Sequence, residues 1–156
     1  MFPSLRPILN KGGAGRYISR AESAERLMPI AERHIALLRD YDRQLAAMPA
    51  GPGREQIEAM MPYLRTEVSK MSETILSLGG TPPSGAGLGP VGAPTAETDR
   101  DRVRGFLDAE KDFAGAIRDE VDVVHHQERT RAILEHNADA SNARTDLLRG
   151  VLAGLD

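Results

Sequence analysis

Residues 57–78, IEAMMPYLRTEVSKMSETILSL, carry the clearest structural pattern of the chain. Apolar residues recur in it at alternating steps of four and three, at Ile57, Met61, Leu64, Val68, Met71, Ile75 and Leu78. This spacing keeps one stripe of a helix facing a partner and is typical of a long helix in a bundle. Pro62 lies inside the stretch, and we expect a kink there because proline removes one backbone hydrogen bond.

Two further stretches follow the same steps. The first has its stripe at Leu27, Ala31, His34, Leu38, Tyr41, Leu45 and Met48, and the second at Val103, Leu107, Glu110, Ala114, Ile117, Val121 and Val124. In each stripe one polar side chain, His34 or Glu110, occupies a place where an aliphatic residue is expected. These stripes predict an all-α bundle whose interior contains polar groups.

Glycine and proline divide the rest of the chain. We expect a flexible arm over residues 1–17 and a single four-helix domain over 18–156. The start caps are Ser19 or Ser23 for the first helix and Thr95 or Thr98 for the third. The predicted helices cover about residues 19–48, 54–78, 97–122 and 126–154.

Residues 79–96 are rich in glycine and proline and are incompatible with a helix. We expect a long crossover inside one bundle, and an interdomain linker is the alternative. The boundary between the last two helices has no such marker. We place it near residues 122–126, where β-branched and polar residues cluster. A break at residues 137–142 is the competing choice.

Two short connections around one long crossover form the layout of ferritin-like bundles. The stretch from Glu67 to Pro83, EVSKMSETILSLGGTPP, resembles the end of the second helix in rubrerythrin-like and DNA-protecting mini-ferritin proteins, which commonly closes with Leu-Gly-Gly-x-Pro. The stretch from Ile133 to Asp139 lies where the last metal-binding helix of that family would be. The resemblance implies a ferritin-like four-helix bundle with metal chemistry, and assembly into dimers or larger shells.

The metal motifs of that family are degenerate in this chain. Ferritin-like di-iron proteins use one Glu from each of two helices and Glu-x-x-His from each of the other two. The sequence contains no Glu-x-x-His, and the nearest equivalent, His136-x-x-Asp139, has the reversed order.

Counting residues outward from the predicted turns nevertheless brings several polar groups to one level. His34 falls beside Glu67, and Glu110 falls level with His136 and Asp139. Imidazole and carboxylate suit iron or manganese, and open coordination positions permit oxygen or peroxide chemistry. These five residues are the candidate metal ligands.

The alternative is a structural polar layer that specifies helix register without a metal. Glu67 then pairs at the surface, and Glu110 is satisfied by His34, Asn137 or Arg144. In that case a leucine at position 110 fills the seam and stabilises the bundle, provided that the partners of Glu110 are not left unpaired. The arginines of the last helix alternate with acidic residues and predict a solvated face: Arg129, Arg131, Arg144 and Arg149.

Composition limits the function further. The chain has 156 residues, 40% hydrophobic residues, a formal net charge of −3 and no cysteine. This charge gives no reason to expect nucleic acid or an anionic membrane as a partner. No apolar run approaches the roughly 20 residues of a membrane span. We expect a cytoplasmic homo-oligomer, a dimer or larger, that associates through its first two helices.

Two functions fit these observations. The first is a non-catalytic binding, assembly or stress-related module with a ferritin-like fold. The alternative is a metal-binding oxidoreductase or metal-storage protein with a nonstandard site of histidine and carboxylate.

Overall fold

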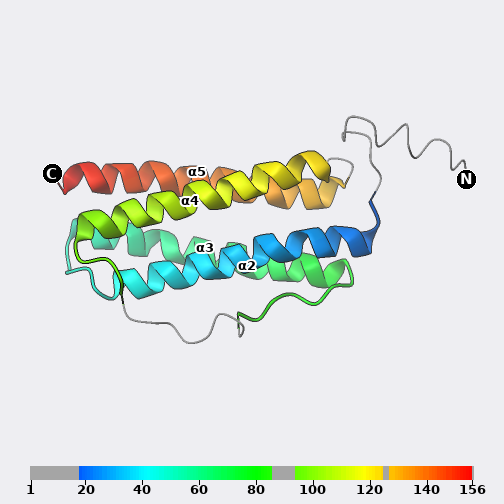
Figure 1. The fold of residues 1–156 in the computed structure, drawn as a ribbon, viewed down its shortest axis with the longest axis horizontal. Helices are drawn as coiled ribbons and strands as arrows, with labels where there is room; N and C mark the ends of the chain where they lie inside the picture. Colours follow the sequence, from blue (N-terminus) through cyan, green and yellow to red (C-terminus); the bar gives the residue numbers. More distant parts are fainter. Residues whose placement is uncertain (1–17, 86–93, 125–126, 156) are drawn as a thin grey trace, which may run out of the picture.

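The computed structural model describes residues 18–85, 94–124 and 127–155, which form four long helices and no strand. The helices are α2 (Arg20–Leu45), α3 (Pro52–Ser77), α4 (Asp99–Val123) and α5 (Glu128–Gly154). They lie side by side in one elongated bundle, with α4 and α5 above α2 and α3 in Figure 1. The prediction of an all-α four-helix bundle is confirmed.

Short polar side chains start two of the helices. Ser19 Oγ accepts a hydrogen bond from the Glu22 amide at 3.1 Å. Thr98 Oγ1 accepts one from the Asp101 amide at 3.0 Å. Each satisfies a backbone donor that has no partner within its own helix. Of the alternative caps considered above, Ser19 and Thr98 are therefore the ones used.

Two glycines end α3. Gly79 has φ of 89°, a left-handed conformation that glycine adopts without steric cost. The Gly80 amide then donates to the Ile75 carbonyl at 2.9 Å. A Cβ added at Gly80 would lie 2.8 Å from the Ala24 Cβ, so this glycine also lets the end of α3 approach the start of α2.

Neither of the two prolines inside a helix interrupts it. α2 and α3 continue through Pro29 and Pro62. α5 is continuous from Glu128 to Gly154, which rules out the competing break at residues 137–142. α2 ends at Leu45, before the expected end near residue 48, because the chain turns before Pro49.

The helix directions place α3 and α4 parallel. α3 ends at one end of the bundle and α4 begins at the other, as the green and yellow-green segments of Figure 1 show. Gly85, beyond the end of α3, lies against Ile35 of α2. The crossover over 79–96 stays a prediction, because residues 86–93 lie outside the described part of the chain. The arm over 1–17 also lies outside it.

The core follows the predicted stripes at most positions, although Leu38, Val68, Leu78, Leu107 and Val121 are only partly buried against it, and it contains polar groups. Leu27, Leu64, Phe106 and Leu148 are fully buried representatives of the four helices. Polar side chains are also buried in the middle of the bundle, among the apolar ones: His34, Glu67, Glu110, Asn137, Ser141 and Arg144. Among the helices of the described residues, none is both long enough and apolar enough to pass through a membrane.

Candidate functional site

Arg144 of α5 is the centre of the buried polar layer. Its Nε lies 2.6 Å from Glu110 Oε2 and its Nη2 lies 3.0 Å from Glu110 Oε1. Its Nη1 lies 2.8 Å from Glu67 Oε1 and 3.3 Å from Oε2. The guanidinium therefore bridges the carboxylates of α3 and α4, and it meets Glu110 in the bidentate arrangement that gives the strongest of these pairs.

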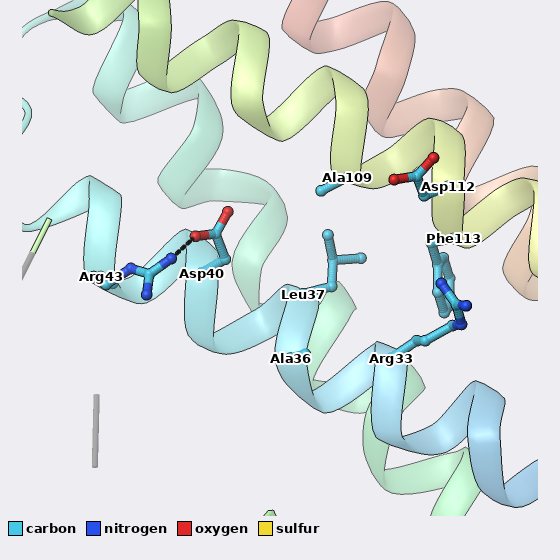
Figure 2. Close-up of a pocket in the computed structure, with 8 residues that line it drawn as sticks. All are labelled: Arg33, Ala36, Leu37, Asp40, Arg43, Ala109, Asp112 and Phe113. Atoms are coloured by element: carbon cyan, nitrogen blue, oxygen red, sulfur yellow. Dashed lines mark hydrogen bonds and ion pairs between the residues drawn. The ribbon is translucent and has the colours of Figure 1, made fainter. Parts of the chain in front are cut away.

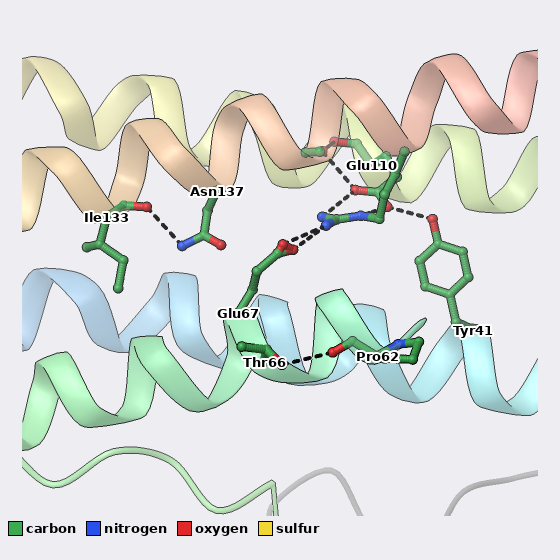
Figure 3. Close-up of polar contacts among 9 residues, drawn as sticks. Tyr41, Pro62, Thr66, Glu67, Glu110, Ile133 and Asn137 are labelled. Atoms are coloured by element: carbon green, nitrogen blue, oxygen red, sulfur yellow. Dashed lines mark hydrogen bonds and ion pairs between the residues drawn. The ribbon is translucent and has the colours of Figure 1, made fainter. Parts of the chain in front are cut away.

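Two hydroxyl groups complete the coordination of Glu110. Tyr41 of α2 donates to Oε2 at 2.5 Å, and Ser141 of α5 donates to Oε1 at 2.7 Å. The Tyr41 ring is held by stacking on Phe106, with centroids 4.4 Å apart. Figure 3 shows Tyr41, Glu67 and Glu110 converging on this point. We call Tyr41, Glu67, Glu110, Ser141 and Arg144 the Arg144 cluster; each helix contributes at least one member.

The protonation states follow from burial and neighbouring charge. Burial lowers the pKa of Arg144, but the hydrogen bonds and charge of Glu110 outweigh it and hold that pKa above its ordinary value. Burial, together with the charge of Glu110, raises the pKa of Tyr41. Both side chains therefore remain hydrogen-bond donors at neutral pH. Burial also raises the pKa of Glu67, against the opposing charge of Arg144.

His34 lies outside the cluster. Its ring stacks on Phe113 with centroids 4.7 Å apart, and neither ring nitrogen has a hydrogen-bond partner within the described chain. Burial, and secondarily the charge of Arg144, lowers its pKa to about 3. A neutral buried imidazole of this kind packs as an aromatic side chain.

The five candidate ligands are thus only partly brought together. Glu67 and Glu110 meet through Arg144, and His34 is buried against Phe113. His136 and Asp139 are exposed on α5. In the part of the chain that the structure describes, no three His, Asp or Glu side chains form a group that could hold a metal ion. Joint metal binding by these five residues stays a hypothesis.

Arg144 is the residue whose environment differs most from the expectation. The arginine-rich pattern of the last helix predicts a solvated side chain here, whereas a partner of Glu110, the other possibility for Arg144, lies inside; the side chain is only 6% exposed and bonds to Glu110. The signal lies in the spacing of the buried α5 residues, which follow steps of three and four: Thr130, Leu134, Asn137, Ser141, Arg144, Leu148 and Val151. Because four of these seven residues are polar, they do not form an apolar stripe that the sequence alone reveals.

A depression of about 320 Å³ lies between α2 and α4 (Figure 2). Leu37, Phe113 and two alanines line it together with charged side chains, of which Arg43 bonds to Asp40. Phe113 also stacks on His34, so this ring is shared between the depression and the buried imidazole. The charged side chains that line the depression are exposed or half-buried, whereas those of the Arg144 cluster are buried.

No protein-family model and no curated protein sequence matches the chain. Solved structures do match. One is a crystal structure from Vibrio cholerae, described as a DPS protein and a member of a broad superfamily of ferritin-like diiron-carboxylate proteins. The TM-score is 0.69 and the identity 15%, over 88% of this chain and 91% of that chain. The chain therefore has a ferritin-like fold, as the resemblance implied.

Proposed function

We propose that this protein is a non-catalytic module with a ferritin-like fold, which acts by assembling with copies of itself, and that its buried polar layer is structural. The observation that carries the proposal is the position of Arg144 between Glu67 and Glu110. Its guanidinium bonds to both oxygens of each carboxylate. Carboxylates occupied in this way are not available to an ion.

The donor set also differs from the one that ferritin-like di-iron chemistry requires. Such sites combine four carboxylates with two histidines and keep coordination positions open. Here two carboxylates face one cation. The nearest buried imidazole, His34, stacks on Phe113 instead. The residues present do not fit a di-iron centre, and we derive no metal-dependent reaction for the wild-type chain.

Assembly rests on the fold and on two exposed apolar side chains of α3. Tyr63 is 74% exposed and Leu76 is 59% exposed. Exposed tyrosines commonly anchor contacts between subunits, and an exposed leucine adds apolar area to such a contact. They lie on one of the two helices through which we expect copies to associate. A cytoplasmic location remains part of this proposal.

Light scattering at micromolar concentration tests the assembly, and the expected result is a dimer or larger. Tyr63→Lys should shift the distribution toward smaller species, because it places a charge at the anchor. Glu73→Lys, which changes an exposed side chain of the same helix, is the matched control. A wild-type protein that is monomeric throughout rejects the assembly role.

The alternative is a metal-binding oxidoreductase or storage protein that uses His34, Glu67, Glu110, His136 and Asp139 with iron or manganese. One observation favours it: the Arg144 cluster has two carboxylates and a single cation, so it keeps a net negative charge when both are ionised. Ferrous iron added to the wild-type protein in air distinguishes the two functions. If the wild-type protein binds stoichiometric iron and Glu67→Gln does not, the result supports the alternative. If ferrous iron is oxidised at the same rate with and without the protein, the result supports the structural layer.

A further inference from the structure

Arg144 occupies its place as a metal ion would. The guanidinium touches four carboxylate oxygens, two from α3 and two from α4, at distances between 2.6 and 3.3 Å. Tyr41 and Ser141 then hold the oxygens of Glu110 from two further helices. A positive charge surrounded by carboxylate oxygens, of which those of Glu110 are held by further hydrogen bonds, is the electrostatic arrangement of a carboxylate ion site.

Among the described residues, no other cation could replace the Arg144 guanidinium between Glu67 and Glu110. Within the described residues, Arg144 is the one cation bonded to Glu67 or Glu110. His136 contributes only its charge to Glu67, and its side chain is exposed. Glu110 is 0% exposed and Glu67 is 6% exposed. Removing the guanidinium therefore leaves two buried carboxylates facing each other, which must take up protons, water or another cation.

The donors that remain decide which cation suits them. All are oxygens: two carboxylates, the Tyr41 phenol and the Ser141 hydroxyl. Hard divalent cations such as Mg²⁺ and Mn²⁺ prefer this kind of donor and complete their coordination with water. Two carboxylates also balance a divalent charge, whereas they leave one negative charge beside a guanidinium.

We infer that Arg144 is the resident cation of this layer, and that a hard divalent metal ion takes its place only when the guanidinium is removed. This inference rests on the proposed structural role of the layer. It adds that one side chain keeps the layer free of metal and that the carboxylates around it form a latent ion site.

The test is binding of Mn²⁺ to the full chain and its Arg144→Ala variant, measured from the loss of the free Mn²⁺ spectrum and by calorimetry. We expect Arg144→Ala to bind about one Mn²⁺ per chain, with a higher melting temperature in Mn²⁺. The wild type should show no saturable binding. Combining Arg144→Ala with Glu67→Gln should abolish the binding, because one of the two carboxylates is lost.

Two control variants test whether the lost positive charge, and not the smaller side chain or the loss of any arginine, creates the Mn²⁺ site. Arg144→Lys keeps a positive charge at the position and should bind no Mn²⁺. Arg65→Ala removes an exposed arginine, paired with Asp42 at 3.0 Å, and should behave as the wild type. If Arg144→Ala does not fold alone, refolding with and without Mn²⁺ becomes the measurement, and recovery of helix content in Mn²⁺ is the supporting result.

The inference is overturned if Arg144→Ala neither binds Mn²⁺ nor refolds in it, or if the wild type binds Mn²⁺ as tightly as the variant. These results are distinct from those that test the proposed function. A wild type that assembles and leaves iron oxidation unchanged keeps the proposed function even when Arg144→Ala ignores Mn²⁺. A monomeric wild type rejects the assembly role even when the variant binds the ion.

Discussion

Replacing Glu110 by leucine tests the Arg144 cluster most directly. The sequence alone allowed this change to stabilise the bundle, on the condition that no partner is left unpaired. The structure shows that the condition fails. Tyr41 loses its acceptor, and Arg144 keeps only Glu67. Ser141 retains a bond to the Glu110 carbonyl at 3.2 Å, so it contributes little to the cost.

The magnitude follows from these losses. An unpaired buried hydroxyl costs about 1–3 kcal/mol. Removing one partner of a buried ion pair costs about 3–5 kcal/mol, and the lower end applies because Glu67 remains with Arg144. The leucine recovers about 2 kcal/mol through burial of its side chain. We therefore expect Glu110→Leu to lower the free energy of unfolding by about 2–4 kcal/mol.

Urea unfolding followed by far-ultraviolet circular dichroism at neutral pH measures this loss, with a melting temperature roughly 10 °C lower as the thermal counterpart. Glu73→Leu, at an exposed position of α3, is the control and should change stability by about 0.5 kcal/mol or less. The double variant Glu110→Leu/Arg144→Leu should be less destabilised than the sum of the single variants, by about 1–3 kcal/mol. A Glu110→Leu protein as stable as the wild type refutes the reasoning.

Three further predictions concern other positions. His34 is neutral in the folded protein, where its pKa is about 3. The unfolded chain therefore binds more protons, and the free energy of unfolding falls as the pH drops from about 6.5 toward 3. His34→Phe should remove the share of this acid sensitivity that is due to His34, measured by urea titrations at several pH values. Glu67 has a raised pKa, so the wild type should lose stability relative to Glu67→Gln as the pH rises above 4.5, and an unchanged difference between the two proteins from pH 4 to 7 contradicts this. Gly80→Ala places a methyl group 2.8 Å from the Ala24 Cβ and should cost about 1–3 kcal/mol in thermal unfolding, whereas Gly150→Ala, where a Cβ meets nothing within 4 Å, should cost nothing.

The sequence predicted the fold from three stripes because apolar spacing marks most of the buried face of α2, α3 and α4. It also placed His34 and Glu110 in buried stripes and left Glu67 either in the polar layer or at the surface, and the structure buries all three. The residues of the last helix that lie level with Glu110 differ from the predicted ones. α4 ends at Val123 and α5 begins at Glu128, so the turn is centred beyond residue 124. This shift moves the position level with Glu110 from between His136 and Asp139 to Ser141.

Arg144 could be named beforehand only as one of several possible partners of Glu110. An arginine among polar residues usually lies on a solvated face, and its burial depends on two carboxylates from other helices meeting at one point. That meeting is a tertiary property. It depends on how α3, α4 and α5 are aligned with one another along the bundle, and the periodicity within each helix carries no information about that alignment.

The Arg144 cluster also bears on how the two halves of the bundle find each other during folding. The hairpin of α4 and α5 contains Glu110, Ser141 and Arg144, whereas the hairpin of α2 and α3 contains Tyr41 and Glu67. Docking in the correct register joins a phenol and a carboxylate to a cluster that already holds its own ion pair. Sliding by one helical turn would bury Glu67 without its cation and Tyr41 without its acceptor. The apolar stripes repeat along each helix and tolerate such a shift, so the charged layer is what penalises misaligned collapse and makes one alignment the lowest in free energy.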